Sequence, residues 1–124
     1  MRLNKGFTII ELLIVIVIIG ILVAITAVSY TGITNGANTS KNQANARSVQ
    51  QAALACHAKN GSFPALTVAG INGCGAGMTI PTGVTVGTPA STDDATKKNI
   101  GLSATGSTLT VTYFDYSSGS VATL

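Results

Sequence analysis

The sequence predicts an α+β protein in which a long N-terminal helix packs on a small antiparallel sheet. Three patterns support this class. An almost uninterrupted apolar stretch covers residues 7–28, an apolar stripe with helical spacing covers residues 49–56, and apolar and polar residues alternate over residues 108–116. The chain has 124 residues, so it has room for one small domain once the apolar stretch is set aside.

The apolar stretch of residues 7–28 is long enough to cross a membrane. As a helix that rises about 1.5 Å per residue it measures about 33 Å, against about 30 Å for a bilayer core. Arg2 and Lys5 precede it, and after Glu11 the next charged residue is Lys41. The positive-inside bias therefore predicts a single pass through the cytoplasmic membrane, with the N-terminus in the cytoplasm and the rest of the chain exported.

A cleavable secretory signal peptide is the simplest alternative for this segment, because it also combines a basic start with an apolar run. The residues that follow the run read VAITAVSYTG, in which Ile25 rather than a small residue lies two positions before Ala27. Small residues are expected at that position in a signal cleavage site. The sequence therefore favours an apolar segment that is not cleaved near Ala27.

Glu11 is costly at the start of an apolar helix. An acidic residue near the centre of a membrane helix costs about 3 kcal/mol, and less toward the ends, so it is expected to face a partner. No Lys, Arg or His lies within residues 7–28. A cut just before Phe7 would create a cation, because the new α-amino group would lie four residues from Glu11, one helical turn away on the same face.

Residues 5–12, KGFTIIEL, and the apolar helix behind them closely resemble the class III signal of type IV pilins and the related pseudopilins. The resemblance implies that a prepilin peptidase cuts between Gly6 and Phe7 and methylates the new amino group of Phe7. It also implies that Glu11 pairs with the N-terminal amine of a subunit already in a growing filament, which fixes the axial register. Val28 stands where many pilins carry a helix-kinking proline, so bending of this helix is left open.

The resemblance covers about the first 30 residues and divides the chain into three parts. Residues 1–6 form the prepilin leader, residues 7–30 the transmembrane and filament-core helix, and residues 31–124 an exported head. Glycines and small polar residues lower the helix propensity of residues 31–39, so a weak or broken helix is expected there. The helix is expected to recover over residues 40–60.

The head is predicted to be a helix with a sheet on its apolar side. Val49, Ala52, Ala53 and Cys56 lie at positions i, i+3, i+4 and i+7 and form one apolar stripe. Asn60-Gly61 predicts the end of the helix. The remaining elements are an extended segment at residues 63–64, a glycine-rich loop at 65–77, strands at 84–86, 101–103, 108–116 and 121–123, and an exposed connection at 88–98.

Cys56 and Cys74 are predicted to form a disulfide, since an exported chain meets an oxidising exterior. The bond would close a loop of about 18 residues and stabilise a small head by about 3 kcal/mol. A metal site formed by Cys56, His57 and Cys74 is the alternative. It lacks a fourth ligand, and consecutive residues point about 100° apart on a helix.

Composition argues against an enzyme and predicts no cofactor. One histidine and few acids leave little for general acid–base chemistry. Asp93 and Asp94 could contact a calcium ion, although a solvated turn explains two adjacent acids more simply. The formal net charge of +3 is scattered rather than gathered in a patch, so DNA is not expected as a strong direct ligand.

The function predicted from these residues is that of a structural subunit of a type IV pilus. Its expected partners are other copies of the chain, the prepilin peptidase, a pilus or secretion assembly platform, and the membrane before assembly into the extracellular filament. A pseudopilin of a type II secretion or DNA-uptake system is the alternative. The polar, Ser- and Thr-rich head favours a displayed pilin, whereas the Phe63-Pro64 element favours a pseudopilin.

Overall fold

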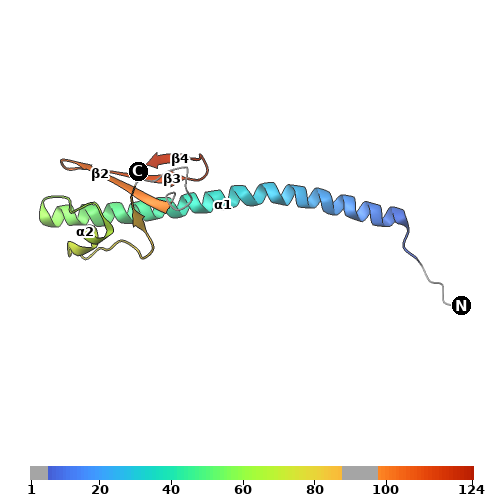
Figure 1. Cartoon of the computed structure of the whole chain (residues 1–124), viewed down its shortest axis with the longest axis horizontal. Helices are drawn as coiled ribbons and strands as arrows, with labels where there is room; N and C mark the ends of the chain where they lie inside the picture. Colours follow the sequence, from blue (N-terminus) through green and yellow to red (C-terminus); the bar gives the residue numbers. More distant parts are fainter. Residues whose placement is uncertain (1–5, 88–97) are drawn as a thin grey trace. The chain divides into compact units, whose positions relative to one another are not determined.

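The computed structural model describes residues 6–87 and 98–124. The chain forms two compact units, Met1–Thr34 and Asn35–Leu124. One long helix, α1 (Ile9–Asn60), begins in the first unit and ends in the second (Figure 1). The second unit adds a short helix, α2 (Val68–Gly73), and a four-stranded sheet. The predicted α+β class is confirmed.

The first unit is described as an isolated apolar helix. Its Ile, Leu and Val side chains from Ile9 to Ile25 are between 50% and 86% exposed, with no polar face to separate them. A helix that is apolar all round belongs in a membrane or in the core of a larger structure. By length and composition, α1 is also the only helix in the described ranges that could cross a membrane.

The predicted break in the helix between residues 31 and 39 is wrong, because α1 is helical throughout. Hydroxyl side chains that compete with a helix in other settings bond inside this one. The Thr34 hydroxyl donates to the carbonyl oxygen of Tyr30 at 3.1 Å. One turn beyond the segment, the Asn42 side-chain amide donates to the carbonyl oxygen of Phe114 at 2.9 Å. The glycines cost about 1 kcal/mol each and do not interrupt α1, whose continuation beyond them is attached to Phe114 through Asn42.

The predicted helix end at Asn60-Gly61 is confirmed. Gly61 has φ = 74°, a left-handed conformation that favours glycine, and its N–H donates to the carbonyl oxygen of His57 at 2.8 Å. The chain then leaves the helix axis without forming helix or strand until α2. The ring of Phe63 lies over that of His57, with a centroid distance of 4.4 Å.

The glycine-rich segment predicted as a loop contains α2. The Thr67 hydroxyl caps this helix by accepting a bond from the Gly70 N–H at 3.0 Å. A Cβ at Gly70 would collide with the carbonyl oxygen of Ala65, so glycine allows the two backbones to approach. The short helix places Ile71 in the core, fully buried. Sequence reasoning missed it because glycine-rich segments rarely favour helix.

The sheet consists of four strands in the order β1-β2-β3-β4. Their bounds are Thr85–Val86, Asn99–Thr105, Thr108–Asp115 and Ser120–Thr123, close to the four predicted strands. The β2–β3 and β3–β4 pairs are antiparallel, as predicted, but β1 runs parallel to β2. The sheet is therefore mixed. Parallel neighbours need a connection of about a dozen residues, and residues 87–98 supply that length.

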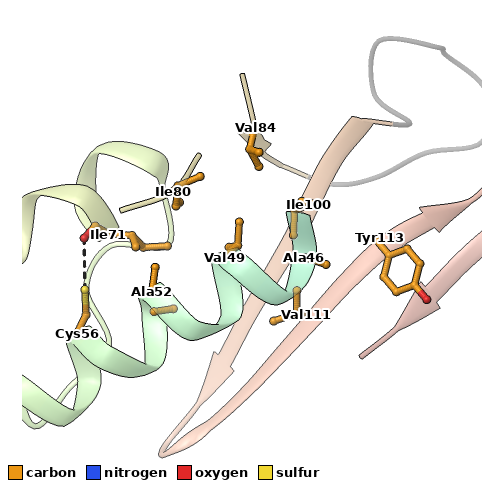
Figure 2. Close-up of a cluster of buried hydrophobic side chains, with 11 residues drawn as sticks. Ala46, Val49, Ala52, Cys56, Ile71, Ile80, Val84, Ile100, Val111 and Tyr113 are labelled. Atoms are coloured by element: carbon orange, nitrogen blue, oxygen red, sulfur yellow. Dashed lines mark hydrogen bonds between the residues drawn. The ribbon is translucent and has the colours of Figure 1, made fainter. Parts of the chain in front are cut away.

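One apolar core joins α1, α2 and the sheet within the second unit (Figure 2). The predicted stripe on α1 lies in it, and all four of its side chains are fully buried. The buried residues of this core are Ala46, Val49, Ala52, Ala53, Cys56, Ile71, Ile80, Val84, Ile100, Val111 and Tyr113. On β3 the predicted alternation holds for Val111 and Tyr113, but Phe114 is buried as well, with its ring edge-on to Tyr116 at 5.1 Å.

Candidate assembly site on the N-terminal helix

Thr8 and Glu11 cap the start of α1. The Thr8 N–H and the Thr8 hydroxyl both donate to Oε2 of Glu11, at 2.9 and 2.8 Å, while the Glu11 N–H donates to the Thr8 hydroxyl at 3.3 Å. This reciprocal arrangement is a capping box, which satisfies N–H groups that have no partner inside the helix. Within its own chain, Glu11 therefore has a local role that its charge alone does not reveal.

The carboxylate of Glu11 keeps one oxygen free. Both Thr8 bonds go to Oε2, and no described group bonds Oε1. Within residues 6–87 and 98–124, no cation lies within ion-pair distance of Glu11. Thr8 thus holds the side chain in one orientation and leaves its second oxygen open to a donor from outside the described chain.

Gly6 and Phe7 lie before the first helical residue, and both are exposed, Phe7 by 89%. In the uncleaved chain Phe7 is outside α1, because the cap at Thr8 starts the helix at Ile9. The one-turn helical spacing predicted between the Phe7 amine and Glu11 concerns the cleaved chain and stays a prediction. A Cβ built on Gly6 would meet no atom within 4 Å, so nothing in the described fold requires glycine there.

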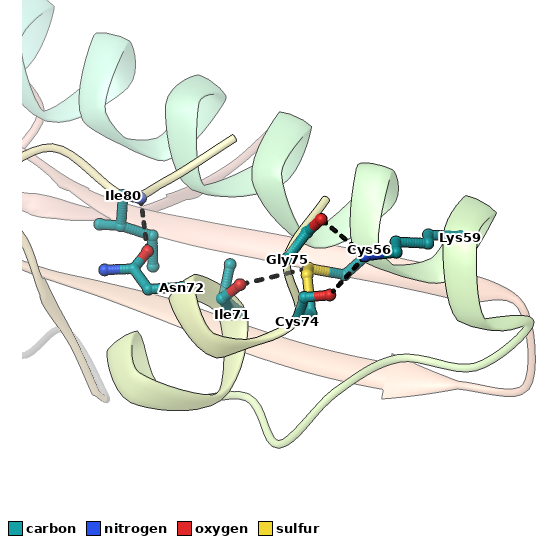
Figure 3. Close-up of a disulfide and its surroundings, with 7 residues drawn as sticks. All are labelled: Cys56, Lys59, Ile71, Asn72, Cys74, Gly75 and Ile80. Carbon is teal, nitrogen blue, oxygen red and sulfur yellow. Dashed lines mark hydrogen bonds between the residues drawn. A yellow bond between two sulfur atoms is a disulfide. The ribbon is translucent and has the colours of Figure 1, made fainter. Parts of the chain in front are cut away.

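A disulfide joins Cys56 at the end of α1 to Cys74, which follows α2 (Figure 3). Their Cα atoms are 5.9 Å apart and the two residues are 18 positions apart in sequence. The Lys59 ammonium donates to the carbonyl oxygens of Cys74 and Gly75, at 3.3 and 2.6 Å. The bond and the lysine attach the loop that carries α2 to the last turns of α1. With both sulfur atoms in a disulfide, the alternative metal site with His57 is excluded.

Asp115 links α1 to the turn between β3 and β4. Its Oδ1 accepts bonds from the Thr39 hydroxyl and from the Ser117 N–H, both at 2.8 Å. The Thr39 hydroxyl, followed by the Ser117 N–H, lowers the pKa of the Asp115 carboxyl below its ordinary value, because these bonds favour the charged form. The carboxylate thereby ties together segments 76 positions apart.

Among the described residues, no cluster of three or more His, Cys, Asp and Glu side chains that could hold a metal ion occurs. An open groove of about 270 Å³ lies along β2 and β3, but no titratable side chain lines its described part; its lining residues are Leu66, Val86, Gly87, Gly101, Leu102, Ser103, Thr110 and Thr112. The predicted calcium alternative at Asp93 and Asp94 lies outside the described residues.

Sequence reasoning singled out Glu11 but missed the capping box that it forms with Thr8. A signal was present, since Thr-x-x-Glu directly before an apolar run is the sequence form of a capping box. The Thr39–Asp115 contact had no comparable signal, because a hydrogen bond between residues so distant in sequence depends on how α1 meets the sheet.

Comparison with known proteins finds one family model and a partly similar relative. Residues 1–27 match the family model described as the prokaryotic N-terminal methylation motif. The chain is also 54% identical over 48 residues to the type IV narrow pilus major component PilA5 of Thermus thermophilus. The matched residues make up 39% of this chain and 41% of that protein. The match thus spans about two-fifths of the relative's length. No solved structure matches. These findings support a relationship to the type IV pilin family over the matched part of the chain.

Proposed function

We propose that this chain is a structural subunit of a type IV pilus. One observation carries the proposal: within the residues that match the methylation motif a helix begins at Ile9, and its apolar side chains are exposed on every side. Such a helix needs lipid or other copies of itself around it. The similarity to a protein named as a pilus major component supports the same function.

In the proposed pathway the chain first spans the cytoplasmic membrane, with its N-terminus in the cytoplasm, and a prepilin peptidase then cuts between Gly6 and Phe7. The bond to be cut lies in an exposed, non-helical segment. Because the fold leaves room for a side chain at Gly6, a strict need for glycine there would come from the peptidase. Phe7 is then N-methylated, and an assembly platform adds the subunit to the filament.

Residues 7–30 are proposed to form the filament core and residues 31–124 the displayed head, with residues 1–6 as the removed leader. The border between the two compact units, at Thr34 and Asn35, lies close to that division. Each Ile, Leu or Val that becomes fully buried contributes about 1.5–3 kcal/mol, so the many apolar side chains of the core outweigh the cost of one carboxylate, about 3 kcal/mol. Apolar burial then provides the affinity of assembly.

Glu11 is proposed to provide the register. Contacts between apolar helices are not directional, so sliding along the axis changes their energy little, whereas an ion pair has one position. The free Oε1 of Glu11 is suited to accept the N-terminal amine of Phe7 from a neighbouring copy. Thr8 holds the carboxylate in place through Oε2.

Mass spectrometry of filaments sheared from cells tests the proposal, with the membrane fraction as the comparison. We expect the sheared material to begin at N-methylated Phe7. Methylated Phe7 confined to the envelope fraction would assign the chain to the pseudopilins of a type II secretion or DNA-uptake system. An intact Met1, or a cut near Ala27, would contradict the processing step.

Two substitutions separate the charge of Glu11 from its capping role. Glutamine also serves at this position of a capping box, so Glu11→Gln keeps the cap and removes the charge. Thr8→Ala keeps the charge and removes the cap, at about 1 kcal/mol. We expect Glu11→Gln to insert in the membrane and to lose most sheared filaments, and Thr8→Ala to assemble with a smaller defect. Quantitative immunoblots of the sheared and membrane fractions measure both.

The opposite ranking would overturn the register argument. If Glu11→Gln assembled normally while Thr8→Ala failed, Glu11 would act through the helix cap and not through its charge. Membrane levels equal to wild type in both variants serve as the control for expression and insertion.

A further inference from the structure

Three segments of the chain place an asparagine two residues before a hydroxyl or a thiol. These are Asn38-Thr39-Ser40, Asn60-Gly61-Ser62 and Asn72-Gly73-Cys74. Asn-x-Ser/Thr is the acceptor pattern for N-linked glycans, and it is used on exposed, exported segments. Because the chain is rich in Asn, Ser and Thr, the pattern alone does not single out a site. The structure separates the three.

Asn38 and Asn72 are held by the fold. Asn38 lies well inside α1, and the neighbouring Thr39 is bonded to Asp115 at 2.8 Å, so exposing this segment to an enzyme would mean unwinding the helix interior and breaking that bond. The side-chain oxygen of Asn72 accepts the N–H of Ile80 at 2.7 Å. Cys74 is in the disulfide and has no thiol to offer.

Asn60 meets none of these obstacles. It is the last residue of α1, and Asn60, Gly61 and Ser62 are all exposed. Among the described residues, neither the Asn60 amide side chain nor the Ser62 hydroxyl forms a hydrogen bond. The chain beyond Asn60 has no regular structure up to α2, so turning this segment out from the surface would break the bond from the Gly61 N–H to the His57 carbonyl oxygen at the helix end, and no bond inside the helix.

We infer that Asn60 is the acceptor of an N-linked glycan. The donor would be an oligosaccharide joined through its C1 to a polyprenyl phosphate or pyrophosphate carrier in the membrane. The Asn60 amide nitrogen attacks C1 and forms the C–N bond while the bond from C1 to the phosphate oxygen breaks. The carrier leaves with that electron pair, and its phosphate takes up the proton that the amide loses. No oxidant or reductant takes part.

The inference rests on the proposed function in one respect, since the head must be exported to meet such a donor. The disulfide from Cys56 to Cys74, one turn before Asn60, would stay in place during transfer, because the residues that turn outward lie beyond it. The glycan would then extend from the exposed end of α1 beside the His57 and Phe63 rings, which are in contact.

The test is glycopeptide mass spectrometry of the full chain isolated from the cells that produce it, reading the Asn60 peptide and the N-terminal peptide in the same sample. We expect a hexose- or hexosamine-containing mass on Asn60. Asn60→Gln and Ser62→Ala should lose it. Ser62→Thr, which keeps the acceptor pattern, and Asn38→Gln, which alters the other hydroxyl-containing segment, should retain it.

Three other outcomes overturn the inference. A bare Asn60 peptide does so, and if that sample begins at methylated Phe7 the proposed pilus function still stands. A glycan that persists in Asn60→Gln and disappears in Ser62→Ala would be O-linked to Ser62. A glycan lost in Asn38→Gln alone would place the acceptor inside α1. Conversely, a glycan on Asn60 in a chain with an intact Met1 supports the inference and contradicts the processing step.

Discussion

Apolar side chains of the same types are exposed in the first unit of this chain and buried in the second. Ile18, in the first unit, is 51% exposed, and its apolar neighbours are exposed as well. In the second unit Ile100 on β2 is fully buried, and so is Val49 on α1 itself. Both units use α1, so the difference does not come from secondary structure. The difference arises because the second unit has other elements of the chain to cover its apolar side chains, whereas the first unit has none.

The second unit covers its own core with a sheet, a short helix, one disulfide and a few polar contacts, and its stability is therefore a property of one molecule. The first unit has no such cover, and its apolar surface is satisfied only by lipid or by other copies. A substitution in the first unit should therefore affect the environment of the chain, and one in the second should affect its folding. The following substitutions test this division.

The largest expected effect comes from the same substitution made in both units. Ile100→Ala removes a fully buried side chain and should lower the free energy of unfolding of the head by about 2–5 kcal/mol. Ile18→Ala should leave that free energy unchanged and weaken filament assembly. Denaturant unfolding in detergent, followed by near-UV signals of the head tyrosines, measures the first effect, and the yield of sheared filaments measures the second.

Membrane levels of both variants serve as the control. If Ile18→Ala destabilised the head as much as Ile100→Ala does, the two units would fold as one and the division would be wrong.

A smaller effect is expected from the disulfide. Replacing Cys56 and Cys74 together by Ala should lower the free energy of unfolding of the head by about 3 kcal/mol, since the bond closes an 18-residue separation. Reducing agent should shift the unfolding midpoint of the wild type and have no effect on the double variant, which is the matched control. A wild type that is insensitive to complete reduction would show that Lys59 and the core hold the α2 loop without the bond.

The smallest expected effect concerns the stability of the head at low pH. The folded-state pKa of Asp115 lies below its ordinary value of about 3.9. The bonds of its carboxylate therefore contribute fully to the stability of the head above about pH 3.9, and this contribution disappears as the pH falls through the folded-state pKa. Asp115→Asn should therefore reduce the loss of head stability on acidification. Thermal midpoints at about pH 7 and about pH 3 measure it, and an unchanged acid dependence would show that the Thr39 bond is not kept in solution.

Much of the head could be predicted from its sequence, because local patterns carry the information. The 49–56 stripe, the stop at Asn60-Gly61 and the alternation on β3 all depend on residues within a few positions of one another. The parallel pairing of β1 with β2 was not predictable in this way. It depends on where a connection of a dozen residues returns the chain, and the residues of β1 are compatible with either direction.

The N-terminal part also has features that the sequence determines and features that depend on the folded structure. The sequence by itself determined that residues 7–28 need an apolar environment, that Glu11 needs a partner there, and that the leader resembles that of the pilins, because hydrophobicity and charge are properties of each residue. Only the tertiary structure decided that α1 runs unbroken to Asn60, that Thr39 meets Asp115, and that one Asn-x-Ser segment is free while the other is held. These outcomes depend on groups far apart in sequence, whose contact energies arise only once the chain has folded.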